Sequence, residues 1–165
     1  MRKRPIIIVC LAVLAAWAVS PFKLGIVLGS SMTPALRNHQ VILIQEGYYR
    51  GHAPRVGDVV VFRRDSDTLV KRVWASSGDK LWEVRDPTVG SFLVATEAEL
   101  RSLRRTVRNA PGVGTLHQVI VPPGCVYVVG DGGQCSLDSR TFGPIPVKSL
   151  SGRVVGVPAL APNAH

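Results

Sequence analysis

The chain has 165 residues, of which 46% are hydrophobic and 19% charged, and Lys and Arg outnumber Asp and Glu by 20 to 11. This length favours one compact domain, and the composition excludes both a disordered chain and a protein with several membrane spans. The net charge of +9 would suit an anionic partner. The sequence has no helix-turn-helix pattern, basic aromatic ribbon or zinc-finger spacing, however, so we expect no nucleic-acid binding.

The N-terminal segment predicts a membrane anchor. Residues 5–22 carry no charge and, as a helix, would rise about 27 Å, close to the hydrocarbon thickness of a bilayer. Three cations at positions 2–4 precede this run, so the N-terminus is expected in the cytoplasm and the rest of the chain on the extracytoplasmic face. Residues 1–23 would then form a cytoplasmic tip and a single transmembrane helix. The alternative is a cleaved signal peptide ending at residues 18–20, which Pro21 disfavours because proline is a poor residue after a scissile bond.

After the anchor, short apolar runs rich in β-branched residues alternate with turns rich in Gly, Pro and Asp. The predicted strands lie at residues 26–28, 40–45, 58–62, 68–74, 80–84, 119–121 and 125–129. Residues 24–156 are therefore expected to form a mainly β domain, and residues 157–165 a flexible tail. A capping box at Thr96 predicts one helical insertion near residues 96–109. Its arginines face away from its leucines, toward either solvent or anionic lipid headgroups.

The cysteines and histidines give no sign of a metal site. Cys125 and Cys135 lie beyond the anchor, on the side of the membrane where disulfides persist, with nine residues between them. They form either a disulfide that clamps this loop or two reduced, packed thiols, and the sequence leaves both open. Because the three Cys and four His residues lack metal-ligand spacing, we expect no metal and no cofactor.

Four short motifs carry the chemistry of the chain. They are Gly-Ser-Ser-Met-Thr-Pro-Ala-Leu at 29–36, Gly-Asp-Val-Val-Val-Phe at 57–62, Val-Lys-Arg-Val leading to Gly-Asp at 70–79, and Gly-Asp through Cys-Ser-Leu-Asp-Ser-Arg to Phe-Gly at 130–143. A serine becomes a good nucleophile when a base takes its proton, and a lysine can be that base if burial lowers its pKa. Alternation along a strand would place Lys71 on the face of Leu69 and Val73, which supplies apolar surroundings, and Arg72 on the opposite face.

In this order and spacing, the motifs resemble the successive conserved boxes of type I signal peptidases, the membrane-anchored S26 serine proteases that remove signal peptides. The resemblance covers nearly the whole chain and implies an antiparallel β domain like those of signal peptidases and self-cleaving repressors. It makes Ser31 the nucleophile, with its backbone amide as an oxyanion donor, and Lys71 the general base. It also makes Ser136 the hydroxyl that orients the lysine, and Asp138 and Arg140 an ion pair that holds their loop against the dyad.

The chain departs from the family pattern at Gly29, where bacterial members with two oxyanion donors have a side-chain hydroxyl. The second donor is then missing, another backbone amide, or Ser30 in a shifted turn. The resemblance further implies two shallow apolar pockets for a small-x-small peptide, lined by Val27, Leu36, Leu69 and Val70. Pro34 and Leu36 are expected to start the strand into which the substrate docks.

The resemblance implies a signal peptidase I, a Ser/Lys endopeptidase that cleaves exported preproteins after a small residue at Ala-x-Ala type sites. Its partners would be signal peptides of preproteins and the lipid bilayer of the cytoplasmic membrane, and we expect a monomer. The eight residues from Lys23 to Ser31 span at most about 29 Å, which keeps the site near the membrane surface.

Three alternatives to this function differ in what they require. A specialised S26 peptidase that processes one client, such as a pilin or a conjugation protein, stays open. A self-cleaving repressor is disfavoured, because an apolar segment fills the place of the DNA-binding domain that such a protein needs. A β domain that only holds peptides is disfavoured, because it would have no use for the full catalytic set.

Overall fold

The computed structural model describes residues 20–86, 88, 90–94, 96–109, 114–133 and 136–158. Most of the predicted anchor, Cys135 and residues 159–165 of the predicted tail therefore lie outside the described residues. Within the described ranges, no helix has the length and apolar character needed to cross a bilayer. The last residues of the predicted anchor segment, Phe22 and Lys23, lie in the first strand of the domain.

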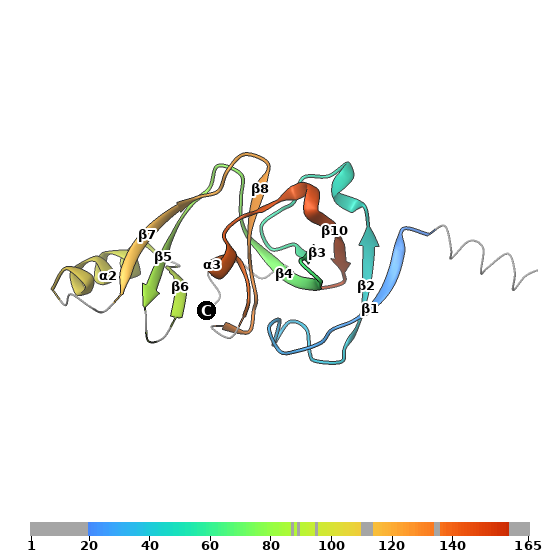
Figure 1. Cartoon of the computed structure of the whole chain (residues 1–165), viewed down its shortest axis with the longest axis horizontal. Helices are drawn as coiled ribbons and strands as arrows, with labels where there is room; N and C mark the ends of the chain where they lie inside the picture. The colour runs from blue at the N-terminus through green and yellow to red at the C-terminus, as the bar shows by residue number, and fades with distance from the viewer. Residues whose placement is uncertain are drawn as a thin grey trace, which may run out of the picture.

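A seven-stranded antiparallel sheet forms the larger part of the molecule, in the order β1-β2-β10-β3-β4-β8-β9 (Figure 1). Its strands are β1 (Phe22–Ile26), β2 (Val41–Glu46), β3 (Val59–Arg64), β4 (Asp67–Ser76), β8 (Cys125–Val129), β9 (Ile145–Pro146) and β10 (Leu150–Val155). Short helices lie in its connections, namely η1 (Tyr48–Arg50), α3 (Ser139–Phe142) and η3 (Val147–Ser149). The prediction of a mainly β, antiparallel domain is confirmed for the described residues.

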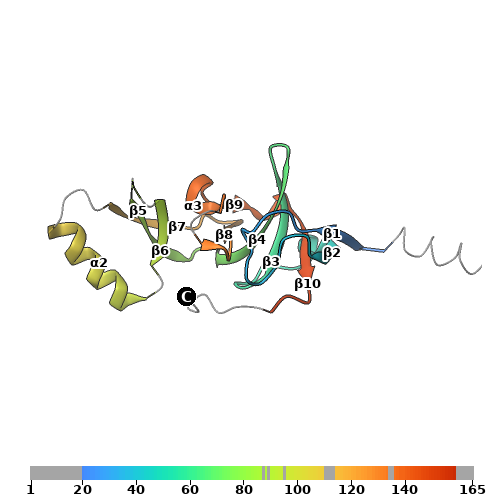
Figure 2. The same ribbon diagram turned by 90° about the horizontal axis from the view of Figure 1, so that it is seen from below.

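A smaller antiparallel sheet, β6-β5-β7, lies at the end of the molecule opposite β1 (Figures 1 and 2). It consists of β5 (Lys80–Asp86), β6 (Gly90–Val94) and β7 (Thr115–Ile120), with α2 (Glu97–Asn109) between β6 and β7. This helix confirms the predicted insertion, and the Thr96 hydroxyl accepts a hydrogen bond from the Glu99 amide as a cap. On the arginine face of α2, the Arg104 guanidinium lies over the Trp82 ring of β5, and a contact of this face with lipid headgroups stays a prediction.

The hydrophobic core explains why the first four residues of β3 are all apolar. Val60 and Phe62 pack in one buried cluster, whereas Val59 and Val61 pack in another, so both faces of this strand are covered. A third cluster, around Tyr127, draws on strands of both sheets and joins them. These clusters fix β3 and β4 side by side, in a register that pairs Val60 with Lys71.

The predicted strand positions are largely right, with five corrections. The first strand ends at Ile26, where a strand was expected to begin, and the segment of Pro34 and Leu36 is a turn rather than a strand. Three strands were missed, namely β6, the two-residue β9, and β10. In β10, Gly152 interrupts the apolar pattern because a Cβ there would lie 2.5 Å from the Gln45 carbonyl oxygen, and the register shifts beside it.

Candidate active site

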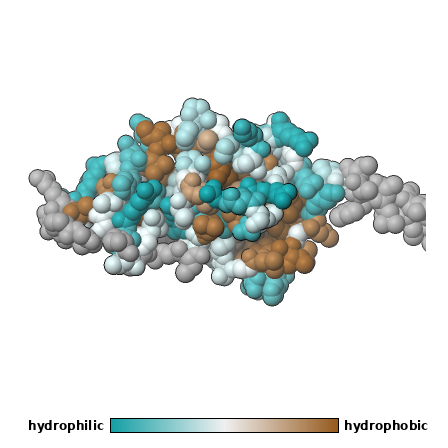
Figure 3. All heavy atoms as spheres, viewed as in Figure 1, coloured by the Kyte–Doolittle hydropathy of each residue, from teal (hydrophilic) through white to brown (hydrophobic). Residues whose placement is uncertain are grey.

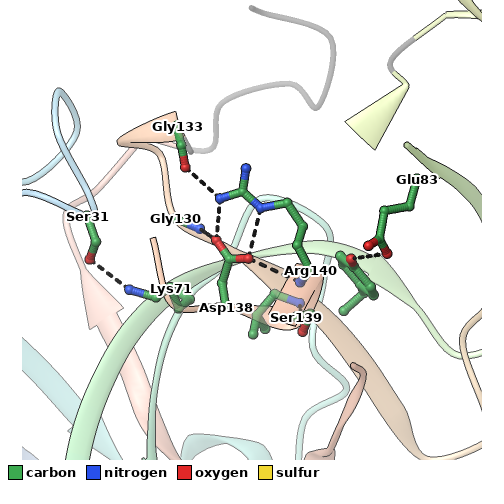
Figure 4. Close-up of polar contacts among 10 residues, drawn as sticks. Ser31, Lys71, Glu83, Gly130, Gly133, Asp138, Ser139 and Arg140 are labelled. Atoms are coloured by element: carbon green, nitrogen blue, oxygen red, sulfur yellow. Dashed lines mark hydrogen bonds and ion pairs between the residues drawn. The ribbon is translucent and has the colours of Figure 1, made fainter. Parts of the chain in front are cut away.

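Ser31 and Lys71 meet at the surface of the seven-stranded sheet. Ser31 lies in the turn after β1, Lys71 lies in β4, and Lys71 Nζ donates a hydrogen bond of 2.7 Å to Ser31 Oγ (Figure 4). The two residues are 40 positions apart in the sequence, so the fold alone brings them together. This distance allows a proton to pass directly between the hydroxyl and the amine.

The amine of Lys71 is buried in an apolar part of the sheet, and Lys71 is 3% exposed. Leu69 and Val73 belong to the same cluster as Val60, the residue opposite Lys71 on β3, whereas Val70 packs in the other cluster. The predicted alternation along β4 is therefore confirmed. Burial lowers the pKa of Lys71, because removing the ammonium ion from water disfavours the charged form.

The turn around Ser31 is fixed by its backbone. Gly29 has a φ of +94°, in the left-handed region that favours glycine, and its amide donates to the Asn38 side-chain oxygen at 2.8 Å. Since this amide is engaged, it is not free to bind an oxyanion. The Ser31 amide, in contrast, donates no hydrogen bond to any described residue and stays available. Met32, the next residue, is buried in the core and anchors the turn.

The loop after β8 presses against the backbone of this turn. The Gly132 amide donates to the Ser31 carbonyl oxygen at 2.9 Å. A Cβ on Gly130 would lie 2.4 Å from that same oxygen, and one on Gly132 would lie 2.5 Å from the Ser30 carbonyl oxygen. Only glycine permits so close an approach at these two positions, which explains the glycines of the fourth motif.

Asp138 and Arg140 form the predicted ion pair and hold this loop in place. The Arg140 side chain donates to both carboxylate oxygens of Asp138, at 2.9 and 2.7 Å, and to the Gly133 carbonyl oxygen at 2.6 Å (Figure 4). Asp138 also accepts from the Gly130 amide at 2.9 Å and is the N-cap of α3. Both side chains are almost fully removed from water, so the pair is a rigid brace.

Ser136 does not make the hydrogen bond expected of it. The residue is 7% exposed, and its Oγ has no hydrogen-bond partner among the residues that the structure describes. A Cβ on Gly130 would lie 2.2 Å from this oxygen, so Ser136 packs against the start of the loop. The predicted contact by which Ser136 would orient Lys71 is therefore not formed in this structure.

A second buried ion pair, between Arg72 and Asp131, was not predicted. The Arg72 guanidinium donates to both Asp131 oxygens, the shortest contact being 2.7 Å, and also to the carbonyl oxygens of Gly57 and Pro158 at 2.8 and 3.0 Å. The sequence indicated that Arg72 would need an acidic partner, because it lies within a strand that is buried on both faces. A cation there needs a buried acid, and the fourth motif supplies one.

A cleft of about 470 Å³ opens beside the Ser31–Lys71 pair. It is lined by residues 25–28 on one side, 66–71 on the other, and by Ser31, Met32, Ile42, Ile44 and Val61. Three predicted pocket residues, Val27, Leu69 and Val70, line this cleft. Leu36 does not line it, because it is 1% exposed and packs in the core with Met32 and Ile42.

Cys125 lies half-buried at the start of β8. The other cysteine of the predicted disulfide, Cys135, lies outside the described residues, so the disulfide stays a prediction.

Comparison with known proteins identifies the family. The family model described as signal peptidase, peptidase S26, matches residues 2–158. The chain therefore belongs to the signal peptidase family, peptidase S26.

Named relatives are found in bacteria and in plant organelles. Signal peptidase I of Bacillus caldolyticus is 29% identical over 88% of this chain and 84% of its own length. A mitochondrial ATP-independent inner membrane protease subunit 1a of Arabidopsis thaliana is 33% identical over 77% of this chain and 64% of its own length. A crystal structure of a signal peptidase I from Enterococcus faecalis V583 has 25% identity and a TM-score of 0.40, over 62% of this chain and 97% of that one.

Proposed function

We propose that this protein is a signal peptidase I that cleaves the signal peptides of exported preproteins after a small residue, with Ser31 as nucleophile and Lys71 as general base. The observation that carries the proposal is the 2.7 Å contact between the buried Lys71 Nζ and Ser31 Oγ at the wall of the cleft. Family membership makes the reaction a peptide hydrolysis. A buried amine whose pKa is lowered by desolvation, placed beside a hydroxyl, supplies the base that such a reaction needs.

Lys71 would carry the proton in each step of the proposed reaction. As Ser31 Oγ attacks the carbonyl carbon of the scissile bond, its proton passes to Lys71 Nζ, and the carbonyl oxygen becomes an oxyanion. The Ser31 amide donates to that oxyanion. When the C–N bond breaks, the Lys71 ammonium returns its proton to the leaving amine. Water then attacks the acyl-enzyme ester, with Lys71 again as the base, and releases the signal peptide.

The sheet offers a place for an extended substrate. β1 is the edge of the seven-stranded sheet, and β8 covers β4 only from Arg72 to Ser76, so residues 67–71 of β4 have a strand on one side only. The cleft lies between these two free edges. A substrate strand placed there would hydrogen-bond to both edges, while Val27, Leu69 and Val70 face its side chains. A shallow apolar cleft of this kind accepts small side chains at alternate positions.

A position at the membrane surface is supported by the apolar surface beside the cleft. Leu24, Ile26, Leu28 and Val41 are all exposed, and Figure 3 shows hydrophobic surface gathered near β1 and the turn that follows it. This patch directly follows the segment predicted as the anchor. We infer a single-pass protein of the cytoplasmic membrane, with its catalytic domain on the extracytoplasmic face.

The test is cleavage of a preprotein with an Ala-x-Ala site by the detergent-solubilised full chain. Ser31→Ala and Lys71→Ala should abolish cleavage, whereas the matched control Ser30→Ala should retain it. In the wild type, kcat/KM should rise with pH as a base titrates below the usual lysine pKa of about 10.4. Equal activity of Ser31→Ala and wild type would overturn the proposal. A panel of signal peptides then separates a general peptidase from one that processes a single client.

A further inference from the structure

The path of a substrate beyond the scissile bond is constrained by β8. A peptide that pairs with residues 67–71 of β4 meets β8 at the next position, where Arg72 pairs with Val129. The residues after the scissile bond cannot continue along this edge, since its hydrogen-bonding groups are already taken. They must pass over the end of β8, at Gly130.

A second pocket lies at that point. It has a volume of about 360 Å³ and is lined by Trp74, Phe92, Leu93, Val129, Gly130, Asp131, Gly133 and Arg140, which we call the β6 pocket. Gly130 borders both this pocket and the turn of Ser31, because it lines the pocket and a Cβ at this position would lie 2.4 Å from the Ser31 carbonyl oxygen. The wall contributed by Phe92 and Leu93 belongs to β6 of the smaller sheet.

The lining of the β6 pocket favours an apolar ligand. Its two charged residues are already paired, Asp131 with Arg72 and Arg140 with Asp138. Neither can bind a charged group without breaking a buried ion pair. The remaining side chains are Trp74, Phe92, Leu93 and Val129, so the free surface of the pocket is aromatic and aliphatic. A volume near the lower end for ligand pockets suits one or two side chains rather than a whole cofactor.

We propose that the β6 pocket is a subsite for the mature side of the preprotein, and that it binds an apolar side chain from one of the first four residues after the scissile bond. This inference rests on the proposed function. It gives the smaller sheet a role in choosing substrates, because β6 supplies the far wall of the subsite.

The test compares preproteins that share one Ala-x-Ala site and differ only after it. Each of the first four mature positions in turn carries Ala, Leu or Asp in an otherwise Ala- and Ser-based sequence. For the wild-type chain, Leu at one position should raise kcat/KM about tenfold over Ala or Asp, the usual effect of filling an apolar pocket. Phe92→Ala should reduce this advantage of Leu over Ala to less than about twofold, because it removes one apolar wall of the pocket.

The matched control is Val94→Ala, because Val94 lies on the same strand but lines a different pocket. It should keep the preference for Leu, and so should Phe92→Leu, which preserves an apolar wall. Equal wild-type rates, within about twofold, at all four positions would overturn the inference even if Phe92→Ala does not fold. An equal loss of preference in Val94→Ala would also overturn it. The proposed function fails separately, if the wild type cleaves none of the substrates or if Ser31→Ala cleaves them all.

Discussion

The two sheets of this molecule treat charge differently. Beside the larger sheet, the Arg72–Asp131 and Asp138–Arg140 pairs are almost wholly removed from water. In the smaller sheet, Glu83 is equally buried, but its partner Arg85 is 55% exposed. Both buried pairs brace the loop that packs against Ser31, whereas Glu83 accepts from the Tyr127 hydroxyl and links β5 to β8.

The difference in burial of these ion pairs shows which part of the molecule needs a fixed geometry, namely the loop beside Ser31. A charge pair in a low-dielectric interior is strongly oriented, and breaking it leaves an uncompensated charge, so the larger sheet holds its loop firmly. The smaller sheet packs around a few apolar residues and exposes most of β7. We therefore expect substitutions beside the larger sheet to disable chemistry, and those in the smaller sheet to change stability or substrate choice.

The largest expected effect is that of Lys71→Met, which should reduce kcat/KM roughly 10⁴-fold or more while leaving the fold intact. Because burial holds the pKa of Lys71 below its usual 10.5, the unfolded wild type binds more protons than the folded protein between these two pKa values, and wild-type stability falls as the pH drops from 10.5 toward the lowered pKa. Lys71→Met should thus be more stable than wild type at neutral pH, with the difference shrinking toward pH 10.5. Urea unfolding at several pH values measures this, and a pH-independent difference would contradict it.

Next in size is Asp138→Asn, which leaves the Arg140 guanidinium buried beside a neutral group. Loss of one partner of such a pair typically costs about 3–5 kcal/mol of unfolding free energy, and we also expect a large drop in cleavage. The control is Asp65→Asn, since the Asp65 side chain is 89% exposed and pairs with Arg64 only at 3.8 Å. Its cost should be about 0–1 kcal/mol, and equal effects of the two variants would refute the proposed brace.

In the smaller sheet, Glu83→Gln should lower stability by about 1–3 kcal/mol, because a buried acceptor of two hydrogen bonds is replaced by a neutral amide. Burial raises the pKa of Tyr127, so its hydroxyl stays protonated as the donor to Glu83. Thermal unfolding of Glu83→Gln, Tyr127→Phe and the double variant measures the coupling. Additive effects would show that this hydrogen bond contributes no coupling between the sheets.

The smallest effect is expected on the surface of α2. The Arg104 guanidinium lies 4.8 Å from the centre of the Trp82 ring, a contact typically worth about 0.5–1 kcal/mol when exposed. Arg104→Ala should lose that amount in chemical unfolding, while Arg105→Ala, exposed on the same helix, should lose almost nothing. Cleavage rates should stay unchanged in both, and a rate loss in either would show that α2 takes part in the reaction.

Sequence reasoning worked where local pattern and structure agree. Alternation in β4 placed Lys71 among apolar residues, and the capping box at Thr96 located α2. Sequence reasoning missed β10, because the glycine at position 152 is required by the close approach of β10 to β2, and the local sequence pattern carries no sign of that contact. The prediction that Leu36 lines the substrate pocket was wrong. From the sequence alone, an apolar residue that lines a cleft cannot be distinguished from one that is buried in the core beneath it.

The residues of the candidate active site could be predicted from the sequence, but the hydrogen bonds and ion pairs among them could not all be predicted. The family resemblance implied the Asp138–Arg140 pair, whereas it implied no pairing of Arg72 with Asp131, which are 59 positions apart and meet only in the folded sheet. The unbonded Ser136 hydroxyl could not be foreseen either, because its position depends on how the glycine loop packs. Contacts between residues far apart in the sequence, other than the Ser31–Lys71 pair that the resemblance implied, are thus the part of the site that the sequence leaves undetermined.

The Arg72 side chain has a consequence for how the protein matures. Its hydrogen bonds reach Gly57, Asp131 and Pro158, three segments spread over most of the domain. Synthesis proceeds from the N-terminus, so Ser31 and Lys71 are made long before Pro158 arrives. The newly made chain therefore contains Ser31 and Lys71 before Arg72 can reach Asp131 and Pro158, so the loop that packs against Ser31 is braced only after nearly the whole domain has been synthesised.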